Sequence, residues 1–167
     1  MERKQEELGI HILENARNEL YYHFPYLDGA FACISGKASD QTRTIGTDGE
    51  DFLFSPEYLL ELYVKKPEAV RRGYLHMLLH CLYLHIFREN QEDKRMWNLA
   101  CDIAVEQIIT REKLHSLKIP ENEVRRKVLQ RLGGQADSAE KICRKLKEEA
   151  FSFRLEEMEE AFHFDDH

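Results

Sequence analysis

The chain has 167 residues, a length that suits one ordinary domain. Hydrophobic residues make up 43% of it and charged residues 33%, which is enough apolar material for a core and excludes a disordered acidic tail. Its 24 lysines and arginines against 31 aspartates and glutamates give a net charge of -7, which argues against nucleic acid or an anionic membrane as partner. Basic runs such as Arg71-Arg72 have acidic neighbours, so we expect them on solvated helix faces.

The cysteines, the N-terminal segment and the apolar runs indicate the cellular compartment. Its four cysteines are scattered and form no C-x-x-C pair, so we expect reduced thiols and no disulfide framework. The N-terminal segment is charged and no apolar core follows it, unlike a signal peptide. The longest apolar run, from Tyr74 to Phe87, is too short for a membrane span. These features predict a soluble cytoplasmic protein.

The first third of the chain predicts a helix followed by short strands. Apolar residues at four-residue spacing predict an amphipathic helix over residues 4–23, which Pro25 ends. Short apolar runs at 31–34, 43–45 and 52–54 are typical of strands, and Thr47-Asp48-Gly49 indicates a tight turn between two of them. We therefore expect a small antiparallel sheet.

The remainder predicts helices only. Ser55-Pro56 begins a helix that runs to about residue 65, and residues 68–88 form the most apolar segment, which predicts a central buried helix. Further helices are expected over 96–110 and, after Pro120, over 121–132, 138–149 and 150–162, with Gly133-Gly134 as a break. This order predicts a single α+β domain over 1–167 that is mostly α.

His76 and His80 are the first candidate functional residues. They lie four apart in the predicted buried helix, so at about 100° per residue their side chains share one face. This spacing lets one helix offer two imidazoles to one metal ion, whose geometry would hold the ring nitrogens roughly 3–3.5 Å apart. His85 is rotated far from that face and is a poor third ligand from the same helix. The alternative is a pair of core histidines with buried hydrogen-bond partners.

The next predicted helix carries a polar line of Asn98, Asp102 and Glu106 at four-residue spacing. The line is either a solvated stripe on an amphipathic helix or the source of a further ligand. In the second case we expect Asp102 to complete a three-ligand site or to orient a ligating histidine, with Glu106 as the alternative ligand. Cys81 and Cys101 lie off these stripes and are expected to be small buried hydrophobic residues.

These motifs together resemble a known family. His76-x-x-x-His80 followed by Trp97-Asn98-x-Ala100-x-Asp102 is similar to the metallopeptidase domain that precedes a von Willebrand A-like domain in some bacterial proteins. The turn at Thr47 and the helix start at Ser55 occur upstream in the same order, and the resemblance covers about residues 20–110 well. It implies a zincin-like fold, in which the histidine-bearing helix lies beneath a small sheet whose edge strand lines a peptide cleft.

The residues and the resemblance predict zinc as cofactor, with His76, His80 and Asp102 as its ligands. The resemblance further implies a peptide or protein as binding partner and an association with MoxR-type AAA+ ATPases. By the same resemblance the von Willebrand A-like domain would begin about where this chain ends, at His167, so we expect the chain to correspond to an N-terminal piece of a longer protein.

Met77 departs from the pattern of the resembled family, which has His-Glu-x-x-His where this chain has His-Met-x-x-His. In such sites the glutamate accepts a proton from the metal-bound water and passes it to the leaving amine. A thioether has no proton to exchange, so the general base is missing. We therefore predict a metal-binding domain without appreciable peptidase activity. The alternative is a metal-free pseudoenzyme that acts as a scaffold or interaction domain.

Overall fold

The computed structural model describes residues 2–88, 93–113, 115–133, 138–148 and 153–164. The chain divides into two compact units, each made of segments that are separate in the sequence. The first comprises Met1–Ile86, Leu114–Ile119 and Phe164–His167, and the second comprises Phe87–Lys113 and Pro120–His163. Gly134 and residues 149–152, which belong to a predicted break and two predicted helices, lie outside the described residues.

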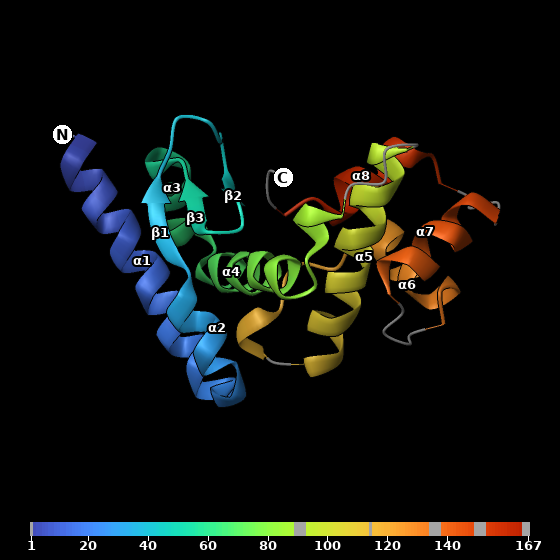
Figure 1. Ribbon diagram of the computed structural model, residues 1–167, viewed down its shortest axis with the longest axis horizontal. Coiled ribbons are helices and arrows are strands. Elements are labelled where there is room, and N and C mark those ends of the chain that lie inside the picture. Colours follow the sequence, from blue (N-terminus) through green and yellow to red (C-terminus); the bar gives the residue numbers. More distant parts are fainter. Residues whose placement is uncertain (1, 89–92, 114, 134–137, 149–152, 165–167) are drawn as a thin grey trace. The chain divides into compact units, whose positions relative to one another are not determined.

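The first unit combines helices with a small sheet (Figure 1). Helix α1 (Glu2–His23) confirms the predicted first helix and contacts strand β1, helix α3 (Pro56–Lys65) and helix α4 (Pro67–Leu82). Its buried side chains recur at helical spacing, and a 3-10 turn, η1 (Pro25–Leu27), follows its end. The α+β class, dominated by helix, is therefore as predicted.

The sheet has three strands in the order β1-β3-β2. The strands are β1 (Ser35–Ala38), β2 (Ile45–Thr47) and β3 (Asp51–Phe54). β2 pairs antiparallel with β3, whereas β1 pairs parallel with β3, with Gly36 opposite Phe52. The prediction of an antiparallel sheet is therefore wrong for one of its two pairings. The reason is topological: β1 runs opposite to β2, the next strand in the chain, but it pairs with β3, which also runs opposite to β2 and so has the same direction as β1.

The predicted turn between β2 and β3 is confirmed, and its side chains explain it. Thr47 Oγ1 donates to the carbonyl of Asp51 at 2.9 Å and accepts from the backbone N–H of Gly49 at 3.1 Å. Asp48 Oδ1 accepts from the backbone N–H groups of Glu50 and Asp51 at 2.9 and 2.8 Å, which lowers the pKa of the Asp48 carboxyl. Gly49 has φ 93°, a conformation that glycine adopts without steric cost.

Two other sequence expectations are corrected. The run 31–34, expected to be a strand, lies mostly in helix α2 (Asp28–Cys33), which buries Phe31. A run of four apolar residues is too short for its periodicity to separate strand from helix. The helix expected over 68–88 ends at Leu82, because Leu84 takes the left-handed conformation with φ 57° and a 3-10 turn, η2 (His85–Phe87), follows.

Helix α4 is packed on several sides within the first unit. It contacts α1, α2, α3, β2 and the 3-10 turn η3 (His115–Leu117). A Cβ at Gly73 would lie 2.5 Å from Cδ1 of Ile45, so glycine permits the close approach of α4 to β2. The ring of Tyr74 lies edge-on to that of Phe52 with centroids 4.5 Å apart. The most apolar predicted segment is thus a buried helix, as expected.

In the second unit, the regular secondary structure of the described residues is helical. It contains α5 (Lys94–Glu112), α6 (Glu123–Arg131), α7 (Ala139–Glu148) and α8 (Leu155–Phe162), of which α5 packs on α7 and α8. The helix start of α5 is capped by Asp93, whose side chain accepts from the backbone N–H of Met96 at 3.0 Å. Its core is built from side chains of all four helices and includes Trp97, Ile103, Val128, Ile142 and Phe162. The helical C-terminal half is as predicted.

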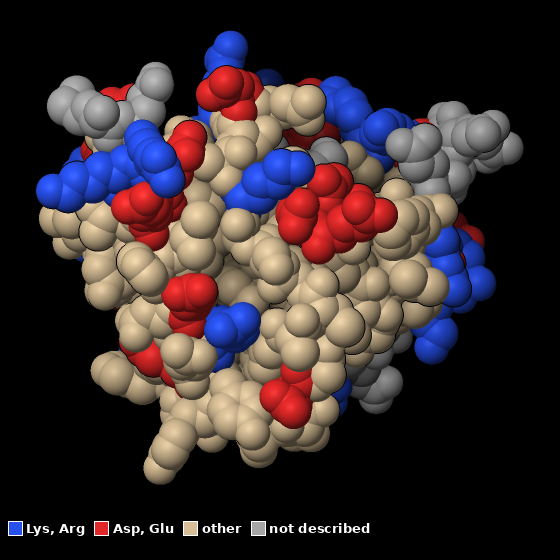
Figure 2. Space-filling model, turned by 60° about the vertical axis from the view of Figure 1, so that its left-hand side comes forward, with Lys and Arg blue, Asp and Glu red and all other residues tan. Residues whose placement is uncertain are grey.

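Acidic and basic side chains are interspersed on the face seen in Figure 2, over a surface made mostly of other residues. Among the described residues, every helix is too short or too polar to cross a lipid bilayer.

Candidate metal centre

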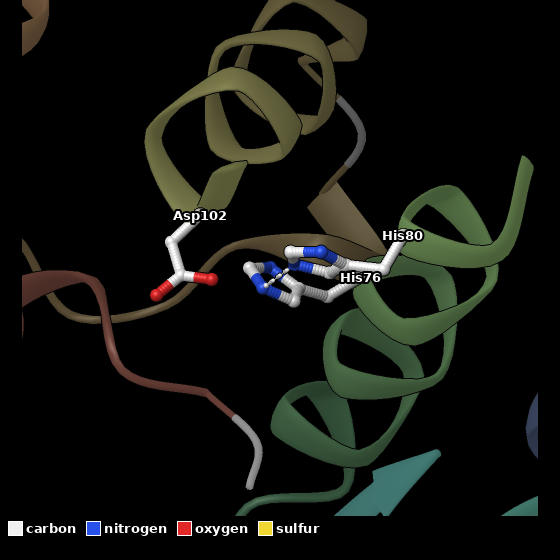
Figure 3. A group of neighbouring side chains, drawn as sticks. All are labelled: His76, His80 and Asp102. Carbon is white, nitrogen blue, oxygen red and sulfur yellow. Dashed lines mark hydrogen bonds between the residues drawn. The ribbon is translucent and has the colours of Figure 1, made fainter. Parts of the chain in front are cut away.

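His76 and His80 project from the same face of α4, as the four-residue spacing predicts. Their Nε2 atoms lie 2.9 Å apart, and both side chains are fully buried. Two nitrogens bound to one tetrahedral zinc lie roughly 3–3.5 Å apart, so a small rotation of either ring would bring the pair to that separation. The first two predicted ligands therefore face one another (Figure 3).

The same face of α4 carries Arg72, one turn before His76. Its Nη1 donates to the carbonyl of Leu117 at 2.7 Å, and its guanidinium lies 5.5 Å from the ring centroid of Phe164. The Phe164 ring also contacts the His76 imidazole, with centroids 5.3 Å apart. Arg72 is buried, so the expectation of a solvated basic run is wrong for this residue.

His85 lies beside His80, on the ring edge opposite to His76. The Nδ1 atoms of His80 and His85 are 3.3 Å apart, and His85 is only 9% exposed. On a continuous helix His85 would be rotated away from the face that carries His76 and His80. That expectation is wrong for its position, because α4 ends at Leu82 and His85 does not follow the helical rotation.

Asp102 and Glu106 lie one turn apart on α5 in the second unit. Asp102 is 7% exposed, Glu106 is fully buried, and Asn98 one turn earlier is half-buried. A solvated stripe would leave these side chains in water, so that alternative is wrong for Asp102 and Glu106. Carboxylates are seldom buried without a partner or a cation, which makes both residues candidates for a functional role.

Figure 3 draws the three predicted ligands together. His76 and His80 extend from α4, and Asp102 extends from α5 with its carboxylate at the end of a short side chain. Two imidazoles and one carboxylate are a donor set that zinc accepts in catalytic sites. Two imidazole nitrogens and a carboxylate oxygen thus suit a divalent metal ion such as zinc.

Met77, Cys81 and Cys101 are poorer candidates than the histidines and Asp102 for a catalytic base or a metal ligand. Met77 is fully buried in α4, where its thioether can neither accept nor release a proton. Burial raises the pKa of the Cys101 thiol, and the neighbouring Asp102 carboxylate shifts that pKa in the same direction. Cys101 therefore stays a neutral thiol, which is a poor metal ligand. Cys81 is half-buried, with its Sγ 3.6 Å from Thr47 Oγ1.

The histidine pair is predictable from the sequence, whereas most of the groups around it are not. Arg72 has the same four-residue spacing from His76 as His80 has, so that signal was present in the sequence. Nothing in the local sequence indicates that Phe164 reaches His76, or that His85 turns back to His80.

A family model described as a putative metallopeptidase domain matches residues 10–163 of the chain. Among the curated proteins and the solved structures, none matches.

Proposed function

The chain belongs to the metallopeptidase-domain family whose model it matches, and from that premise we propose that it binds a divalent metal ion, zinc, through His76, His80 and Asp102. The observation that carries the proposal is the pair of fully buried imidazoles, whose Nε2 atoms face each other at 2.9 Å. Two imidazoles taken out of water into an apolar helix need strong partners, and a metal ion bound by both nitrogens provides one.

Asp102 is the third ligand in this proposal, in preference to Glu106. With His76 and His80 it makes up a group of buried donors that could hold a metal ion, and Glu106 is not part of that group. Asp102 and the histidines belong to different units of the chain.

We also propose a zincin-like arrangement for the first unit. Its support is that α4, the histidine-bearing helix, packs against a small sheet and contacts the edge strand β2. In a zincin-like domain this edge strand would line the bound peptide. The predicted peptide or protein partner, the von Willebrand A-like domain, the MoxR-type ATPase and the cytoplasmic location stay predictions.

When bound at such a site, zinc lowers the pKa of a coordinated water to about 7 and polarises carbonyl groups. The residue that follows the first histidine is the buried Met77, which has no proton to exchange. General acid–base catalysis contributes about 10²–10⁴-fold to the rate of such reactions. We propose that the chain keeps the metal site of its family while lacking this contribution.

The second candidate is a metal-free scaffold that binds a peptide or protein without chemistry. One observation favours it: the hydrogen bond between the Nε2 atoms of His76 and His80 satisfies both nitrogens without a metal ion. The two candidate functions differ in the metal content of the purified protein, so a measurement of that content distinguishes them.

The experiment is elemental analysis of the protein purified after expression in zinc-supplemented medium. We expect about one zinc ion per chain in the wild type and almost none in His76→Ala or His80→Ala. Asp102→Asn keeps the size of the side chain but removes its charge, and it should weaken retention strongly. Glu106→Gln is the matched control on the same helix and should retain the metal. A metal-free wild type would overturn the proposal and favour the scaffold.

A further inference from the structure

The side chain of His85 contacts His80, a predicted metal ligand, but is not itself one of the predicted ligands. Its Nδ1 lies 3.3 Å from the Nδ1 of His80, and the two rings meet at 74° with centroids 5.1 Å apart. His80 thus has both ring nitrogens engaged, Nε2 with His76 on one side and Nδ1 with His85 on the other.

The backbone after α4 produces this contact. Leu84 takes φ 57°, a left-handed conformation that ends the helix and is unfavourable for a residue with a Cβ atom. The turn η2 then places His85 back against the last turn of α4, where the ring of Tyr83 stacks on it with centroids 5.6 Å apart. His85 is therefore held between Tyr83 and His80 in a nearly buried position.

The direction of the bond between the two Nδ1 atoms decides what His80 can bind. A neutral imidazole carries one N–H, on either Nδ1 or Nε2. If His85 donates to His80 Nδ1, the proton of His80 sits on Nε2 and blocks that nitrogen as a ligand. If His80 Nδ1 donates to His85, the Nε2 that faces His76 is a free lone pair. Only the second arrangement lets His76 and His80 bind one ion through their facing nitrogens.

We propose that His85 is a positioning residue, which accepts the Nδ1–H of His80 and so holds His80 in the tautomer whose Nε2 binds the metal ion. This inference rests on the proposed function and adds a residue to it. Metal-bound histidines generally donate their other N–H to a carboxylate, carbonyl or water, and loss of that partner typically weakens metal binding 10–100-fold. His85 takes the place of such a partner. In its Nε2–H tautomer its Nδ1 is a neutral acceptor for the Nδ1–H of His80.

The test compares three variants of the full chain. His85→Phe keeps an aromatic ring against Tyr83 but has a C–H where the acceptor was. His85→Asn places an amide oxygen close to the position of Nδ1 and serves as the rescue variant. His115→Phe removes an exposed histidine from η3 in the same unit and is the matched control. Circular dichroism and thermal unfolding establish that each variant is folded.

The first measurement is zinc affinity in competition with a chromophoric chelator. We expect about 10–100-fold weaker binding in His85→Phe, recovery of most of the affinity in His85→Asn, and wild-type affinity in His115→Phe. A merely structural role for His85 would not be rescued selectively by an acceptor. Wild-type affinity in a folded His85→Phe would overturn the proposal.

The second measurement is nuclear magnetic resonance of protein with ¹⁵N-labelled histidine rings. With zinc we expect the proton of His80 on Nδ1, and without zinc a ¹⁵N–¹⁵N coupling across the Nδ1–Nδ1 hydrogen bond. Ligation through His80 Nδ1, or absence of that coupling in the metal-free protein, would overturn the role of His85. Failure of the wild type to bind zinc would instead overturn the proposed function. It would then also overturn the role of His85 in metal binding.

Discussion

Gly9 of α1 lies directly against the aromatic ring of Phe54, at the end of β3. A Cβ built at Gly9 would be 2.8 Å from Cζ and 3.1 Å from Cδ2 of that ring, and closer still to Cε2. Phe54 is fully buried, so its ring has no free space into which it could move. The absence of a side chain at Gly9 is what lets α1 cover the sheet this closely.

Gly9→Ala should therefore lower the free energy of unfolding, by roughly 1–3 kcal/mol, because the added methyl group overlaps the Phe54 ring. Gly29→Ala is the matched control, since a Cβ at this exposed position of α2 would meet nothing within 4 Å. It should raise the free energy of unfolding by about 0.5–1 kcal/mol through helix propensity. Urea denaturation measures both, and equal effects of the two variants would contradict the packing argument.

Ionisation of the Tyr74 hydroxyl should lower the free energy of unfolding at high pH. Its ring is buried against Phe52, and burial raises the pKa of its hydroxyl from 10.0 to about 12, against a smaller opposing effect of Arg17. Below pH 10 the hydroxyl is protonated in both states and its contribution to stability is complete. Between pH 10 and 12 the unfolded chain loses this proton while the folded chain keeps it, so the free energy of unfolding falls by up to about 1.4 kcal/mol per pH unit.

In Tyr74→Phe the free energy of unfolding should fall less steeply with pH. Denaturant titrations at several pH values between roughly 9 and 12 would measure this slope. Tyr22→Phe, at a position that is 86% exposed, is the control and should keep the wild-type slope. Equal slopes in all three proteins would show that Tyr74 ionises as easily in the folded state as in the unfolded one.

Zinc should stabilise the folded chain by mass action. Binding to the folded state alone adds about 2.7 kcal/mol to the free energy of unfolding at a hundredfold excess over the dissociation constant. A chelator should accordingly lower the Tm of the wild type and leave that of His76→Ala/His80→Ala unchanged. The double variant His11→Ala/His23→Ala, which removes two exposed histidines of α1, should respond like the wild type. A chelator effect of the same size in both double variants would tell against a specific site.

Met77 is the position at which hydrolytic activity could be introduced. We expect no appreciable peptide cleavage by the wild type, because the buried thioether at this position cannot act as a base. Met77→Glu supplies a carboxylate and is the change expected to introduce chelator-sensitive cleavage in a peptide-library assay. It should also lower stability, because it places a carboxylate at a fully buried position.

Met77→Gln is the matched control for this assay, since it adds a buried polar group of similar size without a base. Chelator-sensitive cleavage by the wild type would show that another residue serves as the base, and the buried carboxylate of Glu106 would be the first to test. Cleavage by none of the three proteins would favour the scaffold function.

The parts of the site that the sequence predicted are those that helical geometry determines locally. A separation of four residues places His76 and His80 on one face wherever the segment is helical, and the same rule aligned Asp102 with Glu106. The long helices α1, α4 and α5 were predictable for a similar reason, since their apolar side chains recur with the helical period over several turns. The turn at Thr47 was predictable from its own side chains, which bond to the backbone within four residues.

Tertiary structure decided the rest, because the deciding contacts join segments that are far apart in the chain or depend on one backbone conformation. β1 skips β2, the next strand in the chain, and pairs with β3, so the mixed sheet follows from a choice of partner that no local pattern indicates. Phe164 reaches His76 from the far end of the sequence. The left-handed turn at Leu84 costs energy that local propensity would avoid, and only packing of the surrounding residues can maintain it, which is how His85 comes to lie beside His80.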